Sequence, residues 1–138
     1  KKIERKRARL GRDDDAVGHA AFELGGLFTE QDRLDEGAEW FLEALRIARL
    51  VYIEFHDYAY CILKNLGEIY RRHGKLEEAL NTMKQALRIA RRVHGNESPE
   101  VAELLDGVGS CLGAQGLYDQ AMQKFEVAHE MLRSHFGG

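Results

Sequence analysis

Three kinds of side chain in this 138-residue sequence are able to carry out acid–base, nucleophilic or metal chemistry: histidine, cysteine and carboxylate. The six histidines show no metal-site spacing, and the six-residue step from His129 to His135 does not place them on one helix face. Neither Cys61 nor Cys111 has a potential ligand partner nearby in sequence. Carboxylates are numerous, but no pair stands out. The sequence therefore predicts no catalytic residue, no metal ligand and no cofactor.

Two further patterns have a structural explanation that we prefer. Gly107-x-Gly109 lies inside a helical pattern rather than after a strand, so it does not predict a phosphate-binding loop. Trp40 and Phe41 resemble an aromatic site, but on a helix they are more often packing residues. The two cysteines fit a reducing compartment, and no disulfide is expected between them. We expect a protein that is not an enzyme.

Composition places the chain among soluble helical proteins, with 44% hydrophobic residues, 31% charged residues and one proline. No apolar run approaches the roughly 18 residues of a membrane span, and no signal peptide is visible. We expect a cytoplasmic protein, and the missing initiator Met suggests a piece of a longer chain. Residues 1–12 carry seven basic residues and one acidic residue, so the remaining 126 sum to −9. This basic start is either a nucleic-acid or membrane contact or, as we prefer, the exposed face of a cut helix.

A repeat of 42 residues, without gaps, is the dominant feature of the sequence. It aligns the pairs Leu24-Gly25, Leu66-Gly67 and Val108-Gly109. The same offset aligns further positions across the three copies: Leu34, Leu76 and Tyr118; Gly37, Ala79 and Ala121; Phe41, Met83 and Phe125; Ala44, Ala86 and Ala128. Chance does not easily produce three copies in register.

Each copy reads as two helices separated by a short polar break. The first helices are predicted at 16–30, 57–73 and 99–115, and the second at 34–53, 76–94 and 118–136. The predicted fold is all-α, an α-α superhelix of three hairpins preceded by the tail of an earlier helix. Its units are expected at 1–11 (the tail), 12–53, 54–95 and 96–138. Ser98 and Pro99 suit a helix start, Gly95 suits a helix end, and the aspartates at 13–15 are expected just before a first helix.

The small residues predict how the helices of a hairpin pack. A glycine inside a helix costs about 1 kcal/mol relative to alanine, yet one recurs at the same register in every copy. We expect Gly25, Gly67 and Gly109 to face the small residue of the partner helix, so that the helices approach closely. The large residues are expected to fill the spaces between hairpins, namely Phe28, Tyr70, Leu112, Phe41, Met83 and Phe125.

This pattern resembles the tetratricopeptide repeat family, in which Leu-Gly is followed by an aromatic residue, then by Ala, a large apolar residue and Ala. The second copy matches best, with Leu66-Gly67, Tyr70, Ala79, Met83 and Ala86. The family's usual unit has 34 residues, and the eight extra residues here lengthen the helices and their junction. Residues 86–102 and the length of 42 are similar to kinesin light chain and nephrocystin-type repeats.

The resemblance implies that the first helices line a concave groove that binds a peptide. The candidate groove residues are His19, Phe22, Glu23 and Gly26 in the first copy, Cys61, Lys64, Asn65, Glu68 and Arg72 in the second, and Glu103, Asp106 and Ser110 in the third. Asn65 is similar to the groove asparagine with which kinesin light chains hold a cargo backbone, and an amide both donates and accepts. Glu23 and Gly107 replace it in the other copies.

Three functions follow as hypotheses. The first is a scaffold or adaptor that binds a partner peptide or helix in the groove, with motor–cargo or ciliary complexes as the setting that the resemblance implies. The second is an internal spacer of a longer superhelix. The third, a nucleic-acid contact through residues 1–12, is weaker. No small-molecule substrate and no membrane contact are expected, and the exposed end faces predict some self-association.

Overall fold

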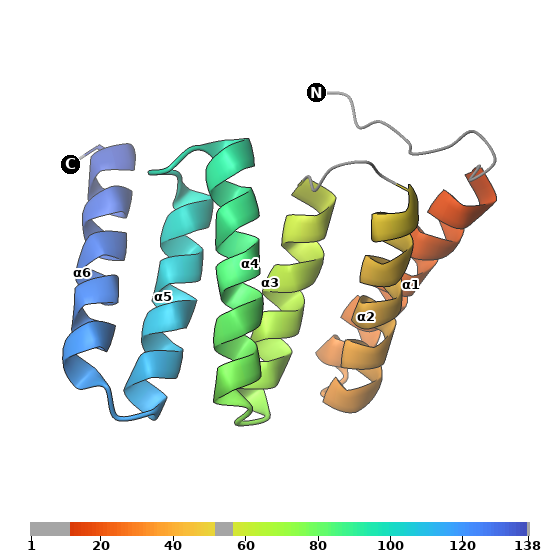
Figure 1. Ribbon diagram of the computed structural model, residues 1–138, viewed down its shortest axis with the longest axis horizontal. Helices are drawn as coiled ribbons and strands as arrows, with labels where there is room; N and C mark the ends of the chain where they lie inside the picture. Colours follow the sequence, from red (N-terminus) through yellow and green to blue (C-terminus); the bar gives the residue numbers. More distant parts are fainter. Residues whose placement is uncertain (1–11, 52–56, 138) are drawn as a thin grey trace.

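Six helices arranged as three antiparallel hairpins make up the computed structural model, which describes residues 12–51 and 57–137. They are α1 (Arg12–Glu30), α2 (Leu34–Val51), α3 (Asp57–Arg72), α4 (Leu76–His94), α5 (Pro99–Ala114) and α6 (Tyr118–His135). Within these residues no strand is present. Figure 1 shows the hairpins side by side along one axis. The predicted all-α superhelical class is therefore confirmed.

The helix boundaries agree closely with the sequence pattern, and α1 is the exception. It begins at Arg12 rather than at residue 16, so the three aspartates lie in its first turns and not before it. The expectation that they precede the helix is wrong, although the attraction of carboxylates to a positive helix end holds in either place. The expected tail at 1–11 and the end of the second helix at 52–53 lie outside the described residues. The division into repeat units stays a prediction.

Helix α5 begins as the sequence predicts. The Ser98 hydroxyl accepts a hydrogen bond from the Val101 amide at 3.2 Å, and Pro99 occupies the first turn, where no amide donor is needed. Gly95, directly after α4, has φ +101°. Because L side chains rarely adopt this conformation, the glycine there ends α4 cleanly.

The three turns inside the hairpins share one backbone conformation. Gly74 and Gly116 have φ of +76° and +86°, and Asp32 occupies the equivalent position with φ +62°. Asp32 is the only non-glycine residue with positive φ in the described part of the chain. Aspartate tolerates the left-handed region better than most residues, so the first turn keeps the same shape at some cost.

The helices of each hairpin meet at the recurring glycine. A Cβ atom on Gly25 would lie 2.8 Å from the Phe41 ring, and one on Gly67 would lie 2.8 Å from Cγ of Met83. On Gly109 it would lie 2.9 Å from the Phe125 ring. The nearest atoms therefore belong to the large residue of the partner helix and not, as expected, to the small one. The large residues pack first within their own hairpin.

The small residues at the equivalent of position 37 still permit the close approach. A Cβ on Gly37 would lie 3.2 Å from the Gly25 carbonyl oxygen, so the two backbones nearly touch. Met83 also reaches the next hairpin, since its sulfur lies 3.1 Å from the Cβ position of Gly107. Large residues thus cover the glycine of their own hairpin, and Met83 extends to its neighbour.

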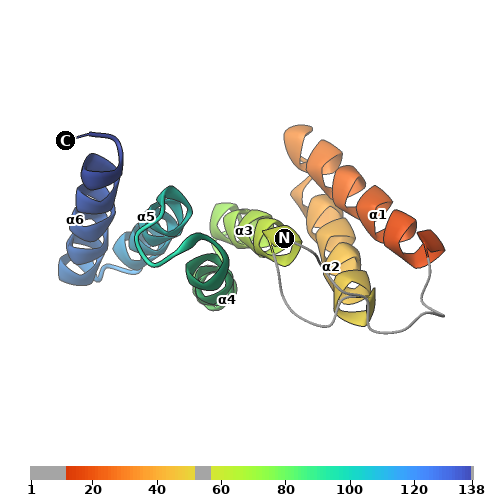
Figure 2. The same cartoon turned by 90° about the horizontal axis from the view of Figure 1, so that it is seen from above.

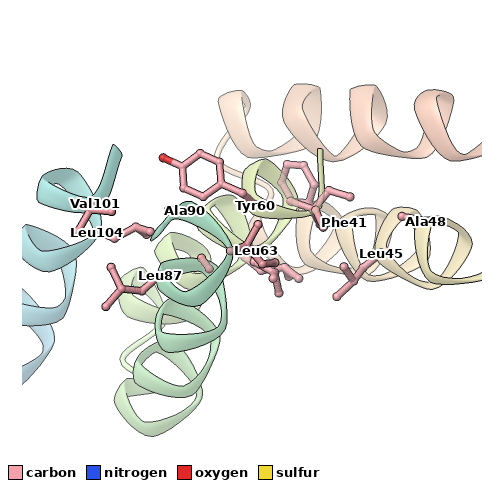
Figure 3. Close-up of a cluster of buried hydrophobic side chains, with 14 of the residues drawn as sticks. Phe41, Leu45, Ala48, Tyr60, Leu63, Leu87, Ala90, Val101 and Leu104 are labelled. Atoms are coloured by element: carbon pink, nitrogen blue, oxygen red, sulfur yellow. The ribbon is translucent and has the colours of Figure 1, made fainter. Parts of the chain in front are cut away.

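Hairpins stack because α2 packs on α3 and α4 packs on α5. Seen from above, α1, α3 and α5 lie on one side of the stack, while α2 and α4 lie on the other (Figure 2). A continuous apolar core runs through these junctions, and Figure 3 shows Phe41, Leu45, Leu63, Leu87 and Leu104 within it. No hairpin buries its apolar face alone, so each hairpin depends on its neighbour for stability.

Candidate functional site

The first helices of the hairpins form a common wall on one side of the stack (Figure 2). The Tyr58 hydroxyl in α3 donates a hydrogen bond to the Gly18 carbonyl in α1 at 3.0 Å. Between α3 and α5, Lys64 Nζ lies 3.4 Å from Glu103 Oε1. These contacts connect α1 to α3 and α3 to α5, so the predicted groove residues lie on one surface.

All twelve predicted groove residues are accessible on this wall. Five are exposed and seven are half-buried, whereas their helical neighbours Ala59, Ile62 and Leu66 in α3 are buried. The exposed residues are His19, Glu23, Arg72, Glu103 and Asp106. The half-buried residues are Phe22, Gly26, Cys61, Lys64, Asn65, Glu68 and Ser110.

Several charged groove residues already form ion pairs within the chain. Arg72 Nη2 donates to Asp32 Oδ1 at 2.6 Å and so links the groove to the first turn. Glu68 pairs with Arg71, which lies one turn further along α3. Because these pairs are substantially exposed, each contributes little to stability, and a ligand exchanges with them at low cost.

Asn65 differs from its charged neighbours. Its side chain is half-buried in the middle of α3, and it forms no hydrogen bond with any residue in the described ranges. The amide therefore keeps one acceptor and one donor group for a ligand. Gly26 provides room on the same wall, since a Cβ atom placed on it would have no neighbour within 4 Å.

Aromatic rings occupy the end of the wall near the start of α3. The Tyr58 ring lies 4.9 Å from His19 and 5.4 Å from Phe22 between centroids, and Phe22 also contacts Phe41 at 5.5 Å. Part of the Phe22 ring therefore packs against the next hairpin and is not available to a ligand. Tyr58 is not among the residues predicted from the sequence; its aromatic side chain in the first turn of α3 was the only signal.

Tyr60 is the second residue that sequence reasoning missed. Its side chain is buried, and its hydroxyl is the buried side-chain polar atom without a hydrogen-bond partner in the described part. Burial, with a further contribution from the Glu103 carboxylate, raises the pKa of Tyr60 far above its usual value. Lys64 Nζ lies 5.5 Å from the ring centroid, so the Lys64–Glu103 pair lies beside this ring.

The thiol in the groove is not activated. Burial, followed by the Asp57 carboxylate, raises the pKa of Cys61, which disfavours the reactive thiolate. Within residues 12–51 and 57–137, no three histidine, cysteine or carboxylate side chains gather in a metal-binding arrangement. None of the described helices has the length and apolarity needed to cross a bilayer.

Two of the predicted groove residues also line a hollow outside the groove wall. Glu103 and Asp106 line a hollow of about 610 Å³ between α5 and α6, together with Phe125, Ala128, His129 and Leu132. In the first two hairpins the equivalents of Phe125, which are Phe41 and Met83, are buried. Glu103 and Asp106 therefore lie at the border between the groove wall and the outer face of the third hairpin.

The tetratricopeptide repeat family model matches the sequence twice, at residues 16–91 and 58–134. The chain belongs to the tetratricopeptide repeat family. Its resemblance on Leu-Gly, the aromatic residue and the two alanines is thus confirmed. No curated protein sequence matches at a significant level.

Solved structures with the same fold include three that cover most of this tetratricopeptide chain. The TPR domain of Arabidopsis FLU has a TM-score of 0.77 at 17% identity, covering 88% of this chain and 98% of that one. The N-terminal domain of stress-induced protein-1 from C. elegans has a TM-score of 0.70 at 15% identity, covering 89% of this chain and 90% of that one. A putative kinesin light chain from Podosopora anserina, with nearly identical TPR-like repeats, has a TM-score of 0.73 at 16% identity. The match covers 95% of this chain and 63% of that one.

At these identities the likeness concerns the fold. The tetratricopeptide fold is that of a protein–protein interaction scaffold, and proteins of this kind are in general not enzymes. The chain spans 63% of the putative kinesin light chain structure.

Proposed function

We propose that this protein is a non-enzymatic scaffold or adaptor that binds a partner peptide or helix along the wall formed by α1, α3 and α5. The observation that supports this is the accessibility of all twelve groove positions, which lie on the first helices of three consecutive hairpins. These positions run across all three hairpins, and an extended surface of this kind is what solenoid repeats use for binding.

The central contact is a hydrogen-bond pair between Asn65 and the backbone of the ligand. An amide side chain offers a donor and an acceptor, which matches the carbonyl and N–H of an extended peptide. Asn65 has neither group engaged by the described residues, and Lys64 and Glu68 flank it with opposite charges. Backbone recognition supplies affinity here, and the flanking charges select among ligands.

Affinity capture tests the groove. The tagged protein, Asn65→Ala and Lys64→Glu are each incubated with lysate, and captured proteins are identified by mass spectrometry. We expect the wild type to retain a specific protein that both variants lose. Arg46→Gln on α2, away from the wall, is the matched control and should retain the same protein. Circular dichroism confirms that all four proteins have equal helix content.

A structural spacer within a longer superhelix is the alternative. It predicts that the two groove variants capture the same proteins as the wild type. The Lys64–Glu103 and Arg72–Asp32 pairs favour this alternative, since they join neighbouring hairpins without a ligand.

The cellular setting is a narrower proposal. A cytoplasmic motor–cargo or ciliary complex is supported by the 42-residue repeat and by the fold shared with a putative kinesin light chain. Co-capture of motor or ciliary proteins with the wild type, and not with Asn65→Ala, tests it. The nucleic-acid hypothesis depends on residues 1–12, whose side chains lie outside the described part; absence of duplex binding at low salt rejects it, since phosphate contacts are strongest there.

A further inference from the structure

The outer surface of α4 carries four cationic side chains that the groove does not use. Lys84, Arg88, Arg91 and Arg92 are all exposed. None of the four forms an ion pair with a carboxylate of residues 12–51 or 57–137. The sequence from 79 to 96 contains no aspartate or glutamate at all, although the whole chain has a net charge of −3. Positive charge is therefore concentrated here and left uncompensated.

These side chains surround a depression in the surface. Together with Leu87 and Asn96 they line a hollow of about 420 Å³ over the C-terminal half of α4. Leu87, which is 9% exposed, adds an apolar wall, and Asn96 closes one end from the loop before α5. We call this surface, defined by those six residues, the α4 basic hollow.

Each of the other two outer helices pairs one arginine with a glutamate three residues earlier. In α2, Arg46 Nη2 lies 2.6 Å from Glu43 Oε2, and in α6, Arg133 Nη2 lies 2.5 Å from Glu130 Oε2. In α4 the 42-residue offset places Gln85 at the position of Glu43. The equivalent of Arg46, which is Arg88, thus has no acidic partner three residues earlier.

The repeat framework does not account for the excess of cations. Lys84 and Arg92 take the positions of Leu42 and Leu50 in α2. Cations in the last turn of a helix are favoured by the helix dipole, and this explains Arg91 and Arg92. It does not explain Lys84 and Arg88, which lie further from the end of the helix. Both line the α4 basic hollow.

We propose that the α4 basic hollow binds an acidic amphipathic helical segment of a partner protein. Guanidinium groups pair bidentately with carboxylates, and three arginines are available. Lys84 and Arg91 are seven residues apart, about 10 Å along the helix axis, which is the rise of two helical turns in a ligand. A helix with carboxylates on that spacing faces all the cations at once.

Leu87 favours a peptide over a bare phosphate backbone. A helical peptide offers an apolar side chain between its carboxylates, and this side chain fills the hollow against Leu87. Figure 2 places α4 on the other side of the stack from α3 and α5, which carry the groove. The two surfaces are therefore independent, and one scaffold can hold two segments at once.

Fluorescence anisotropy tests the proposal with a defined probe. The probe is a fluorescein-labelled, alanine-based helical peptide with glutamates spaced over two turns around one leucine. We expect the full chain to bind it, and the double variant Arg88→Gln/Arg91→Gln to weaken binding about tenfold. Binding should also weaken as salt is raised, because exposed charges are screened.

Matched controls separate this site from general charge effects. Arg46→Gln/Arg133→Gln removes two arginines from the other outer helices and should leave the affinity unchanged. Glutamine keeps helix propensity close to that of arginine, so both double variants should fold, which circular dichroism checks. Asn65→Ala should bind the probe as the wild type does, so failure of the groove proposal and of this one can be told apart.

Specific outcomes overturn the proposal. No binding of the probe, equal binding of a peptide with glutamine in place of every glutamate, or equal loss in both double variants each rejects an acidic-helix site. Tighter binding of a short DNA duplex or of vesicles containing phosphatidylserine, lost in Arg88→Gln/Arg91→Gln, rejects the peptide in favour of a phosphate ligand.

Discussion

Phe41 in α2 and Phe125 in α6 occupy the same register of the repeat, and the ring of each lies on a glycine of the preceding helix. Their exposure differs sharply: Phe41 is 1% exposed and Phe125 is 38% exposed. Helix α2 is covered by α3, whereas α6 packs mainly on α5. Accordingly α2 buries seven residues and α6 buries only Ala121 and Ala128.

The difference shows that the repeat encodes two kinds of contact with different dependence on context. The contact of a large side chain with a glycine belongs to one hairpin and occurs wherever the motif occurs. Burial of that side chain belongs to the junction with the next hairpin. The stability of such a stack is a sum of hairpin and junction contributions, and the same residue type contributes differently at each place.

Replacing each phenylalanine by alanine tests this directly and has the largest expected effect. Phe41→Ala should lower the free energy of unfolding by about 3–5 kcal/mol, because it opens a cavity in a closed junction. Phe125→Ala should cost less than half of that, since its ring is already partly solvated. Urea titrations followed by circular dichroism measure both. Equal costs would mean that the junction adds nothing to the contact with glycine.

The next largest effect is expected from a larger side chain in the core of the second hairpin. Ala79 is fully buried, so Ala79→Phe should destabilise by about 1–3 kcal/mol or more through displaced helices. Ala114→Phe, at an exposed position in α5, is the control and should change stability by about 0.5 kcal/mol at most. A thermal melt of Ala79→Phe that coincides with the wild type contradicts the helix pairing.

The glycines sharpen the comparison at a smaller scale. Alanine gains about 1 kcal/mol of helix propensity over glycine. Gly26→Ala should therefore stabilise by that amount, because its Cβ meets no neighbour. Gly25→Ala should be net destabilising since Phe41 is enclosed, and Gly109→Ala should cost less because Phe125 can move outward. Chemical denaturation measures the free energy of unfolding of the three variants. If Gly109→Ala costs more than Gly25→Ala, the burial of the facing phenylalanine does not set the cost.

The smallest expected effect concerns the exposed ion pair between Glu130 and Arg133 on α6. Hydrogen bonding to Arg133 lowers the pKa of Glu130 below its usual value in the folded state. A lowered pKa gives a contribution present above the unfolded value and lost as pH falls through the folded one. The stability difference between wild type and Glu130→Gln should thus be small at neutral pH and vanish in acid. Melting temperatures between neutral and acidic pH measure this, and a difference that grows in acid contradicts it.

Much of the fold follows from local sequence. The helix from 76 to 94 was predicted to the residue, and Ser98, Pro99 and Gly95 mark its junction with α5 as expected. These features depend on capping and backbone conformation, which neighbouring residues decide. Asp32 shows the limit, because nothing in its local sequence revealed that it adopts the turn conformation of Gly74 and Gly116.

The candidate groove was predicted only as a set of positions. Helical periodicity and the family resemblance placed twelve residues on one face, and all are accessible. The ion-pair partners of these residues could not be predicted from the sequence, since Lys64–Glu103 and Arg72–Asp32 join residues about forty positions apart. The buried hydroxyl of Tyr60 and the contacts of Tyr58 likewise depend on how α1, α3 and α5 lie against one another.

The sequence by itself determined the helices, their pairing and the register of the repeat, because propensity, capping and the glycine motif act over a few turns of helix. Only the tertiary structure decided which equivalent residues are enclosed and which charges remain unpaired. Burial and ion pairing require atoms from a second hairpin, and their positions depend on the packing angle between helices, which no local pattern specifies.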